Sequence, residues 1–484
     1  MLPKNLRFQN KVESAAAKSY RSNIQPQQGS GPYNLSDTIT VNIPTRNNLC
    51  LATTESYFKF SATFTNTTAA NSARLDSCGA HGLIQRIRVW HGSNLLQDID
   101  NYGLLAKMLF DIQISTDATY GKYNILSGTR SDLVAILPTV AAAATAGVAT
   151  AAQIDTAIAT ALAPLGTAGS TGQRLSVIQA NSGDLIAETW AANATVTQTY
   201  CLNLISLMGS LCSSQYFPSF ACTSAPIRME IQLVDQAPKA LCTVTALTSI
   251  QLTNVEYVAN FIELSDQAMG LIQQSLNGQP LQFVVPDYRN YGGSFTTTNA
   301  VATQYNFPIP AKFSSLKSLF VTIRDQGTGN LTFYPYSCVM NGLTDYYFRV
   351  GSQIMPSKVS TTVPEHFAEL LKAIGSISDI NHQPSIDKSS YSLANSVATT
   401  VNVGGVYKQH ASVSSGSFYI GIDMENYANA NKDSIFAGYN SNTDDIFCVL
   451  NFGSTATSQS NRLDGFALFD TVIVFESGTS FVRY

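Results

Sequence analysis

Charged side chains are scarce in this sequence. Of its 484 residues only 12% are Asp, Glu, Lys or Arg, against about 25% in a typical soluble domain, whereas 45% are hydrophobic. The chain also has 22 Tyr and 24 Phe. Interface cores are poor in charge and rich in aromatic residues, so this composition predicts a surface that other subunits cover. An aggregation-prone sheet protein is the alternative.

A strong electrostatic field is also missing. The net charge is −4, which excludes a body that attracts nucleic acid through a general positive potential. Residues 1–31 differ, because five basic residues precede a polar stretch and only Glu13 opposes them. We expect a basic arm and linker that contacts nucleic acid, an anionic membrane or a neighbouring subunit, with a solvated tail as the alternative. The basic residues are Lys4, Arg7, Lys11, Lys18 and Arg21.

Paired cysteines and long apolar runs are absent too. No C-x-x-C motif occurs, so neither a zinc ribbon nor a disulfide framework is indicated, and we expect core thiols in a reducing compartment. No apolar run follows the basic N-terminus, as a secretory signal requires. Residues 133–154 are uncharged but mostly Ala, Thr and Gly, which argues against a membrane span. The cysteines are Cys50, Cys78, Cys201, Cys212, Cys222, Cys242, Cys338 and Cys448.

Motifs for catalysis or metal binding are not visible. His81 and His91 flank one predicted strand, yet the spacing of the five histidines fits no known metal site; the others are His366, His382 and His410. Neither a nucleophile elbow nor a phosphate-binding loop occurs, since Gly121-Lys122 lacks the other residues of that loop. The sequence therefore predicts no catalytic, metal or cofactor site.

Two pairs of carboxylates are the remaining candidates for an active site. A β-sandwich glycosidase needs two carboxylates on facing strands, and Asp98 with Asp100, or Asp444 with Asp445, are the available pairs. Both pairs fall at predicted turns or helix caps, where acidic residues occur for backbone reasons. We therefore predict a protein that is not an enzyme.

The strongest local pattern spans residues 82–112. Alternation from Leu83 to Trp90 predicts a strand, the polar residues 91–94 a turn, and residues 95–99 a second strand. Asp100 is then expected to cap a helix, because apolar residues recur at the spacing of one helical face. Those apolar residues are Leu104, Leu105, Met108, Leu109 and Ile112.

This order of elements returns later in the chain. Ile43-Pro44 matches Ile309-Pro310 at an offset of 266, and residues 57–64 match 316–323 at 259. The Gly-Ser turns at Gly92 and Gly351 are also 259 apart. Residues 227–233 then match 446–452 at 219, and Leu252 matches Phe469 at 217. The fall of 40 is close to the length of an Ala/Thr-rich stretch, about residues 139–180, that only the first half carries.

Such a repeat predicts a duplicated domain. Each copy has enough strand segments for an eight-stranded sandwich. We therefore expect an all-β protein of two tandem eight-stranded jelly rolls with short flanking helices and long loops. The predicted limits are 1–31 for the arm, 32–265 for the first jelly roll with its insertion at about 139–180, and 266–484 for the second.

Three segments resemble the double jelly-roll major capsid proteins of the adenovirus and tectivirus lineage and of the large DNA viruses of protists. Residues 217–231 with 254–258 are similar to the end of the first jelly roll of that family. Residues 466–475 are similar to its final strand. Together with the repeat, the likeness covers about residues 35–484.

The resemblance implies a structural major capsid protein. It would form a homotrimer of pseudo-hexagonal outline, a pseudo-hexameric capsomer that tiles an icosahedral virion shell assembled inside the host cell. Neighbouring capsomers, penton proteins and minor capsid proteins are the implied partners, with the N-terminal arm on the inner side. Helices at residues 101–112 and 363–374 would flank the sheets, and the insertion would be a tower or an intersubunit loop.

Two other functions remain open from the sequence. A carbohydrate- or receptor-binding jelly-roll protein requires an exposed platform of Trp and Tyr, and only Trp90 and Trp190 exist. Trp90 lies in a segment that is expected to belong to the core. An enzyme built on two sandwiches requires a carboxylate pair as described above.

Overall fold

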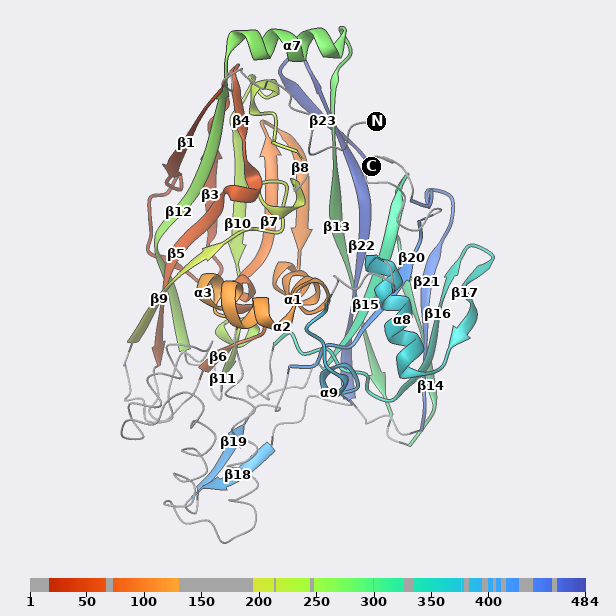
Figure 1. Ribbon diagram of the computed structural model, residues 1–484. Coiled ribbons are helices and arrows are strands. Elements are labelled where there is room, and N and C mark those ends of the chain that lie inside the picture. Colours follow the sequence, from red (N-terminus) through yellow and green to blue (C-terminus); the bar gives the residue numbers. More distant parts are fainter. Residues whose placement is uncertain are drawn as a thin grey trace, which may run out of the picture.

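A computed structural model describes most of the chain (Figure 1). The described residues are 17–66, 73–129, 195–212, 215–243, 248–298, 300–325, 335–375, 377, 383–393, 399–403, 406–410, 415–425, 438–454 and 459–484. Two predicted segments, the arm residues 1–16 and the Ala/Thr-rich stretch at 139–180, lie outside them, as does Trp190.

The first half is a sandwich of two antiparallel sheets. The first sheet runs in the order β1 (Ala17–Ile24), β12 (Thr248–Leu264), β5 (Tyr57–Asn66) and β9 (Thr195–Leu202), while β2 (Tyr33–Asn34) and β4 (Leu49–Leu51) also pair with β12. The second sheet runs β3 (Thr38–Ile43), β10 (Ile227–Leu233), β7 (Ile84–His91) and β8 (Asn94–Asp100). A small pair, β6 (Ala73–Leu75) and β11 (Leu241–Thr243), lies at one end.

The second half repeats this arrangement. One sheet runs β13 (Leu281–Thr297), β22 (Gln459–Glu476), β15 (Leu316–Asp325) and β20 (Tyr419–Asp423), and β23 (Thr479–Arg483) also pairs with β22. The other runs β14 (Thr303–Ile309), β21 (Ile446–Phe452), β16 (Leu343–Val350) and β17 (Gln353–Ser360). A hairpin of β18 (Thr399–Val403) and β19 (Val406–His410) is separate.

The repeat extends to the register of the strands. Ile227 lies opposite Ile43 and His91, and its counterpart Ile446 lies opposite Ile309 and Val350. These pairs have the offsets predicted from the sequence, 219, 266 and 259. The order of the strands in the sheets is also the same in both halves, which confirms two tandem jelly rolls.

One predicted match is wrong. Leu252 pairs with Ala62, and the counterpart of Ala62 at offset 259 is Val321, which pairs with Gly465. Leu252 therefore corresponds to Gly465, at an offset of 213, and not to Phe469 at 217. A shift of four residues leaves every side chain on the same face of a strand, so hydrophobic alternation cannot detect it.

Helices lie between and around the sandwiches. The central one, α1 (Tyr102–Gln113), is buried from Tyr102 to Ile112 because β-sheets and the second half surround it (Figure 1). The others are η2 (Thr53–Glu55), η3 (Gly79–Leu83), α2 (Thr116–Ala118), η4 (Thr119–Tyr123), α3 (Asn124–Ser127), η7 (Ser210–Cys212), η8 (Ser219–Ala221), η9 (Ala237–Lys239), α7 (Asp266–Leu276), α8 (Val363–Ile374) and α9 (Lys388–Tyr391). No helix of the described residues is long and apolar enough to span a membrane.

The start of α1 differs from the prediction. Its N-cap residue is Asn101, with a left-handed φ of 53°, and not Asp100. The carboxylate of Asp100 instead accepts a hydrogen bond from the backbone N–H of Asn101 at 2.8 Å. Asparagine tolerates positive φ, so the chain can turn sharply from β8 into the helix.

The predicted arm and linker also needs correction. Residues 17–24 form β1, which pairs along its whole length with β12. Its side chains are mostly exposed, so the strand has no hydrophobic alternation that the sequence could reveal. Backbone hydrogen bonds to β12 hold the strand in place. The limits predicted for the two jelly rolls stay a prediction.

Candidate functional site

His81 and His91, which flank the predicted strand, have different hydrogen-bond partners. His81 is buried and shares a hydrogen bond of 2.9 Å between its Nδ1 and the hydroxyl of Tyr102, and burial lowers its pKa to about 3. His91 lies 2.7 Å from Ser480 Oγ, and burial also lowers its pKa. Among the described residues no group of three His, Cys, Asp or Glu side chains could hold a metal ion.

The carboxylate pairs are held apart by different partners. Asp98 lies inside β8, as the strand predicted at residues 95–99 implies, and not at a turn or cap; Arg86 contacts it with two nitrogens at 2.7 and 2.5 Å. Asp100 accepts the hydrogen bond from the backbone N–H of Asn101 that is described above. Asp444 accepts a hydrogen bond from the hydroxyl of Tyr439, and Asp445 accepts one from Lys312 at 2.9 Å. Each of the four carboxylates therefore accepts a hydrogen bond from a different group.

Trp90 lies on the outer face of β7, not in the core. Its Nε1 donates to Glu230 at 3.1 Å, and the guanidinium of Arg228 lies 5.4 Å from the ring centroid. Arg88 and Arg228 both pair with the same glutamate. Because the arginine covers the ring, Trp90 does not form an open platform for a sugar.

A cavity of about 770 Å³ lies beside α1 and β9 in the first half. His81, Lys122 and Cys201 are among its lining residues. Burial raises the pKa of the Cys201 thiol, so this cysteine is not the thiolate that a nucleophile requires.

A group of buried polar contacts lies where the two halves meet. Lys107 of α1 is fully buried, and its Nζ donates to Asp111 at 2.5 Å. The same ammonium group contacts three atoms of the second half: the backbone oxygen of Gly416 at 3.0 Å, Ser417 Oγ at 3.2 Å and Tyr419 Oη at 3.2 Å. We call this group of contacts the polar junction.

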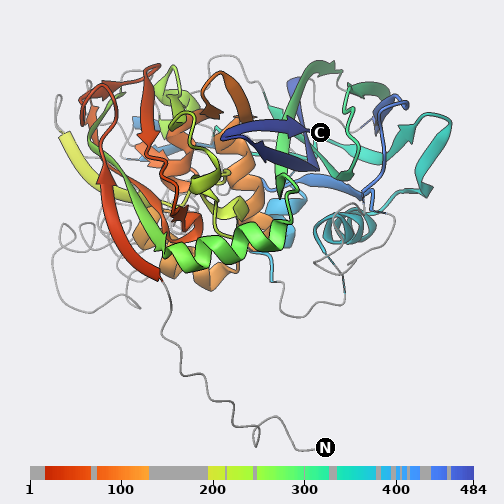
Figure 2. The same ribbon diagram turned by 90° about the horizontal axis from the view of Figure 1, so that it is seen from above.

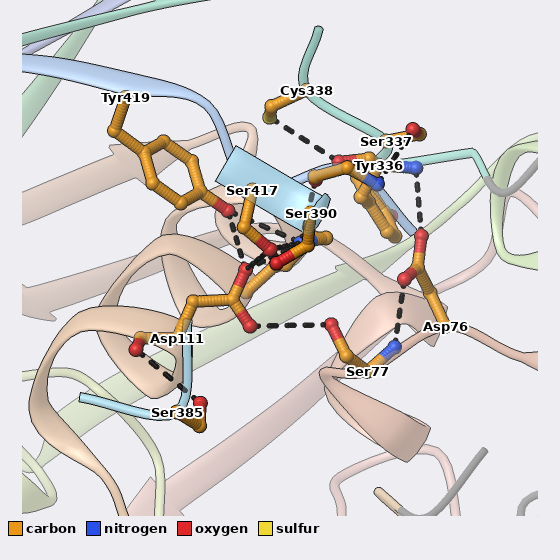
Figure 3. A network of polar contacts seen from close by, with 12 residues as sticks. Asp76, Ser77, Asp111, Tyr336, Ser337, Cys338, Ser385, Ser390, Ser417 and Tyr419 are labelled. Atoms are coloured by element: carbon orange, nitrogen blue, oxygen red, sulfur yellow. Dashed lines mark hydrogen bonds and ion pairs between the residues drawn. The ribbon is translucent and has the colours of Figure 1, made fainter. Parts of the chain in front are cut away.

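Asp111 is the acceptor at the centre of the junction (Figure 3). Its Oδ2 accepts hydrogen bonds from Ser417 at 2.8 Å and Tyr419 at 2.7 Å. Burial by itself lowers the pKa of Lys107, but the charges of Asp111 and Asp76 outweigh it, so the pKa is raised and the ammonium stays charged. A buried ion pair needs such additional hydrogen bonds to offset its desolvation.

Tyr336 of the second half inserts into the first half. Its backbone N–H donates to the buried carboxylate of Asp76 at 2.9 Å (Figure 3). Its hydroxyl donates to the backbone oxygen of Gly82 at 2.8 Å. A Cβ on Gly103 would lie 2.3 Å from this hydroxyl. Two glycines thus leave the space that the tyrosine ring fills.

Two further contacts extend the junction along the strands. Gln97 of β8 donates to Asp287 of β13 at 2.8 Å, and burial raises the pKa of this aspartate to about 7. Asn101 donates to Asp464 at 3.0 Å, and Arg324 pairs with the same carboxylate at 2.6 Å. The halves are therefore joined by satisfied polar groups as well as by apolar packing.

No contact of the junction was predicted from the sequence. Lys107 and Asp111 have the spacing of a helical ion pair, which was the available signal, but such pairs are usually exposed. Their partners Ser417 and Tyr419 are about 300 residues away, and no local pattern connects them. The junction fixes the position of one half relative to the other through the contacts of Lys107 with the second half. Its charged groups Lys107 and Asp111 pair with each other.

Comparison with known proteins identifies the fold. No protein-family model matches the chain, and no curated protein matches its sequence. A quasi-atomic model of the PBCV-1 virus capsid matches with a TM-score of 0.57 at 10% identity, over 99% of each chain. The Sputnik virophage structure matches with 0.57 at 10% identity, over 100% of this chain and 92% of that one.

The mavirus major capsid protein matches in the same way. Its TM-score is 0.53 at 10% identity, over 100% of this chain and 95% of that chain. The matched structures span both halves, and the two halves share one strand order. The chain therefore has the double jelly-roll fold of these viral capsid proteins.

Proposed function

We propose that this chain is the structural major capsid protein of an icosahedral virus. In this proposal it trimerises into pseudo-hexameric capsomers that tile the virion shell, and it assembles inside the host cell. Its role is to build the shell and not to catalyse a reaction.

One observation carries the proposal: two jelly rolls of the same topology lie side by side in one chain, and solved capsid structures match that pair over its entire length. The match depends on the relative placement of the halves as well as on each sandwich, because it covers 99–100% of the chain. A single jelly roll is shared by many unrelated functions, whereas this pairing is much more specific.

The composition supports the same role. A chain with only 12% charged residues has little ionic surface to keep it soluble as a single molecule. Exposed apolar side chains are spread over the described surface, with Ile125 81% and Leu271 62% exposed. Contacts between many copies would cover such groups.

Several partners are part of the proposal. Copies of the same chain come first, as the trimer and as neighbouring capsomers. Penton and minor capsid proteins are expected at the vertices and seams of the shell. The basic N-terminal segment would contact an internal membrane, the genome or an adjacent subunit, because Lys4, Arg7 and Lys11 favour anionic or acidic surfaces.

The experiment that tests the function is light scattering on the purified full chain, followed by electron microscopy of the product. We expect a trimer of about 156 kDa, three times the chain mass of 52.1 kDa, and hexagonal particles in the images. A stable monomer at micromolar concentration would contradict the proposal.

A further inference from the structure

The cavity beside α1 and β9 has walls from both halves of the chain. The first half contributes η2, α1, α3 and β9, and the second half contributes Tyr288 of β13. Helix α1 lies between the two sandwiches in the front view (Figure 1) and in the view from above (Figure 2). The volume of about 770 Å³ is in the range of pockets that hold small organic molecules. An occupant would contact both jelly rolls.

The buried part of the cavity wall is mainly apolar and aromatic. It includes Leu109, Phe110, Ile205 and Tyr288, each at most 9% exposed. The ring of Phe110 packs against the ring of Tyr123, with their centroids 5.2 Å apart. Such a wall favours an uncharged ring system, because a charged group would lose its hydration there without a partner.

The charged lining residues lie at the exposed part of the cavity. Glu55 and Lys122 both line it, and both are exposed. Their charges have opposite signs, so together they add no net charge that would select an anion or a cation. The opening therefore also fits a neutral molecule.

His81 is a polar group in the buried part, and its neighbours determine which ring nitrogen carries the proton. The backbone N–H of Ile205 donates to the hydroxyl oxygen of Tyr102 at 3.0 Å. Among the described residues, the one acceptor left for the hydroxyl hydrogen is Nδ1 of His81, 2.9 Å away. A neutral imidazole whose Nδ1 accepts a hydrogen bond carries its proton on Nε2.

This Nε2–H group has no acceptor in the described part of the chain, although His81 is only 2% exposed. His81 lines the cavity, and its Nδ1 is occupied by Tyr102, so Nε2 is the ring nitrogen available to an occupant. Phe110 meets the imidazole edge to face, with the centroids 5.0 Å apart, and holds the ring plane. A buried donor without an acceptor costs free energy, which an acceptor oxygen of a ligand would recover.

We propose that this cavity binds a neutral aromatic molecule whose carbonyl oxygen accepts a hydrogen bond from Nε2 of His81. The rings of the ligand lie against Phe110 and Tyr288, and its outer end points to Glu55 and Lys122. The site goes beyond the capsid role, because the lining residues all belong to one chain and no second copy is needed.

The test uses the full chain and a pair of bicyclic probes of similar size. Coumarin carries a carbonyl oxygen, whereas naphthalene has no hydrogen-bond acceptor atom. Saturation-transfer NMR measures the affinity of coumarin, and displacement of coumarin measures that of naphthalene. We expect coumarin to bind more tightly. A purely apolar cavity would prefer the more apolar naphthalene, so that order would contradict the proposal, as would a cavity that binds neither probe and holds only water.

A variant identifies the donor. His81→Phe keeps an aromatic ring in place but removes Nε2–H, so we expect the affinity for coumarin to fall about fivefold and that for naphthalene to stay the same. His366→Phe is the matched control, because His366 is also fully buried but does not line the cavity. It should leave both affinities unchanged.

The outcomes separate the role of His81 from damage to the fold. Unchanged coumarin binding in His81→Phe would show that His81 is not the donor and would overturn the proposal. Loss of both probes would mean that the variant has lost the cavity. In that case the order of the two affinities on the natural chain, which needs no variant, decides.

Discussion

At the scale of single residues, Asp287 is a buried carboxylate whose pKa is shifted into the neutral range. It is buried, and its Oδ1 accepts from Gln97 at 2.8 Å and from the backbone N–H of Tyr288 at 2.9 Å. Both donors are neutral, and the guanidinium of Arg289 lies over the rings of Phe313 and Tyr484. Burial therefore dominates and raises the pKa of Asp287 to about 7.

This shift predicts how stability depends on pH. The folded pKa is about 7 and the ordinary value is 3.8, so the folded state binds the proton more tightly. The contribution of Asp287 to the free energy of unfolding therefore falls as the pH rises from about 4 to about 7 and then stays constant. The difference is up to about 4 kcal/mol.

Asp287→Asn should remove this dependence, because the amide oxygen keeps both hydrogen bonds and carries no charge. Urea unfolding at pH 5 and pH 8 measures it. His81, whose pKa burial lowers to about 3, acts in the opposite direction, so only the difference between the natural chain and the variant counts. Equal pH profiles for the two proteins would exclude the assignment to Asp287.

At the scale of elements, α1 joins the sandwiches through its buried ion pair. Replacing Lys107 by Met leaves the Asp111 carboxylate buried without its cation, which costs roughly 3–5 kcal/mol. Adding Asp111→Asn should recover part of the loss, since Ser417 and Tyr419 can still donate to the amide oxygen. Urea unfolding at pH 7 measures both effects.

The control for this prediction is on another helix. Lys372 of α8 pairs with Glu369 at 2.6 Å on the surface, where ion pairs contribute about 0–1 kcal/mol. Lys372→Met should therefore change little. An equally small effect of Lys107→Met would show that water reaches the junction and that the ion pair does not hold the halves together.

At the scale of the whole molecule, the N-terminal residues can be removed in two steps, because β1 begins at Ala17 and ends at Ile24. Deleting residues 1–16 removes Lys4, Arg7 and Lys11 but leaves β1 paired with β12. We expect the trimer to survive this deletion, because every described contact of the fold remains. Light scattering measures the mass of the product.

Deleting residues 1–24 is the matched comparison. It also removes β1, which pairs with β12 from Ala17 to Ile24, so we expect the midpoint of urea unfolding to fall relative to the shorter deletion. Equal midpoints for the two deletions would show that β1 does not stabilise the fold.

The architecture could be predicted from the sequence alone. Alternating apolar residues predicted the strands, and the offsets of Ile43, Gly92 and Ile227 from their counterparts predicted the tandem repeat. These signals are local or are repeated in the chain, so no three-dimensional information was needed. Gly92 and Gly351 are an example. Each turn needs a positive φ, 59° at Gly92 and 57° at Gly351, and glycine adopts such an angle freely.

Only the tertiary structure decided how the halves are joined and which surfaces stay free. Nothing in the sequence near Lys107 indicates that Tyr419 is its partner, or that Tyr336 fills the space beside Gly103. The strand β1 was also not predicted, because its mostly exposed side chains show no hydrophobic alternation. Contacts between distant segments depend on how sheets stack, and this is set by the packing of the whole molecule and not by local periodicity.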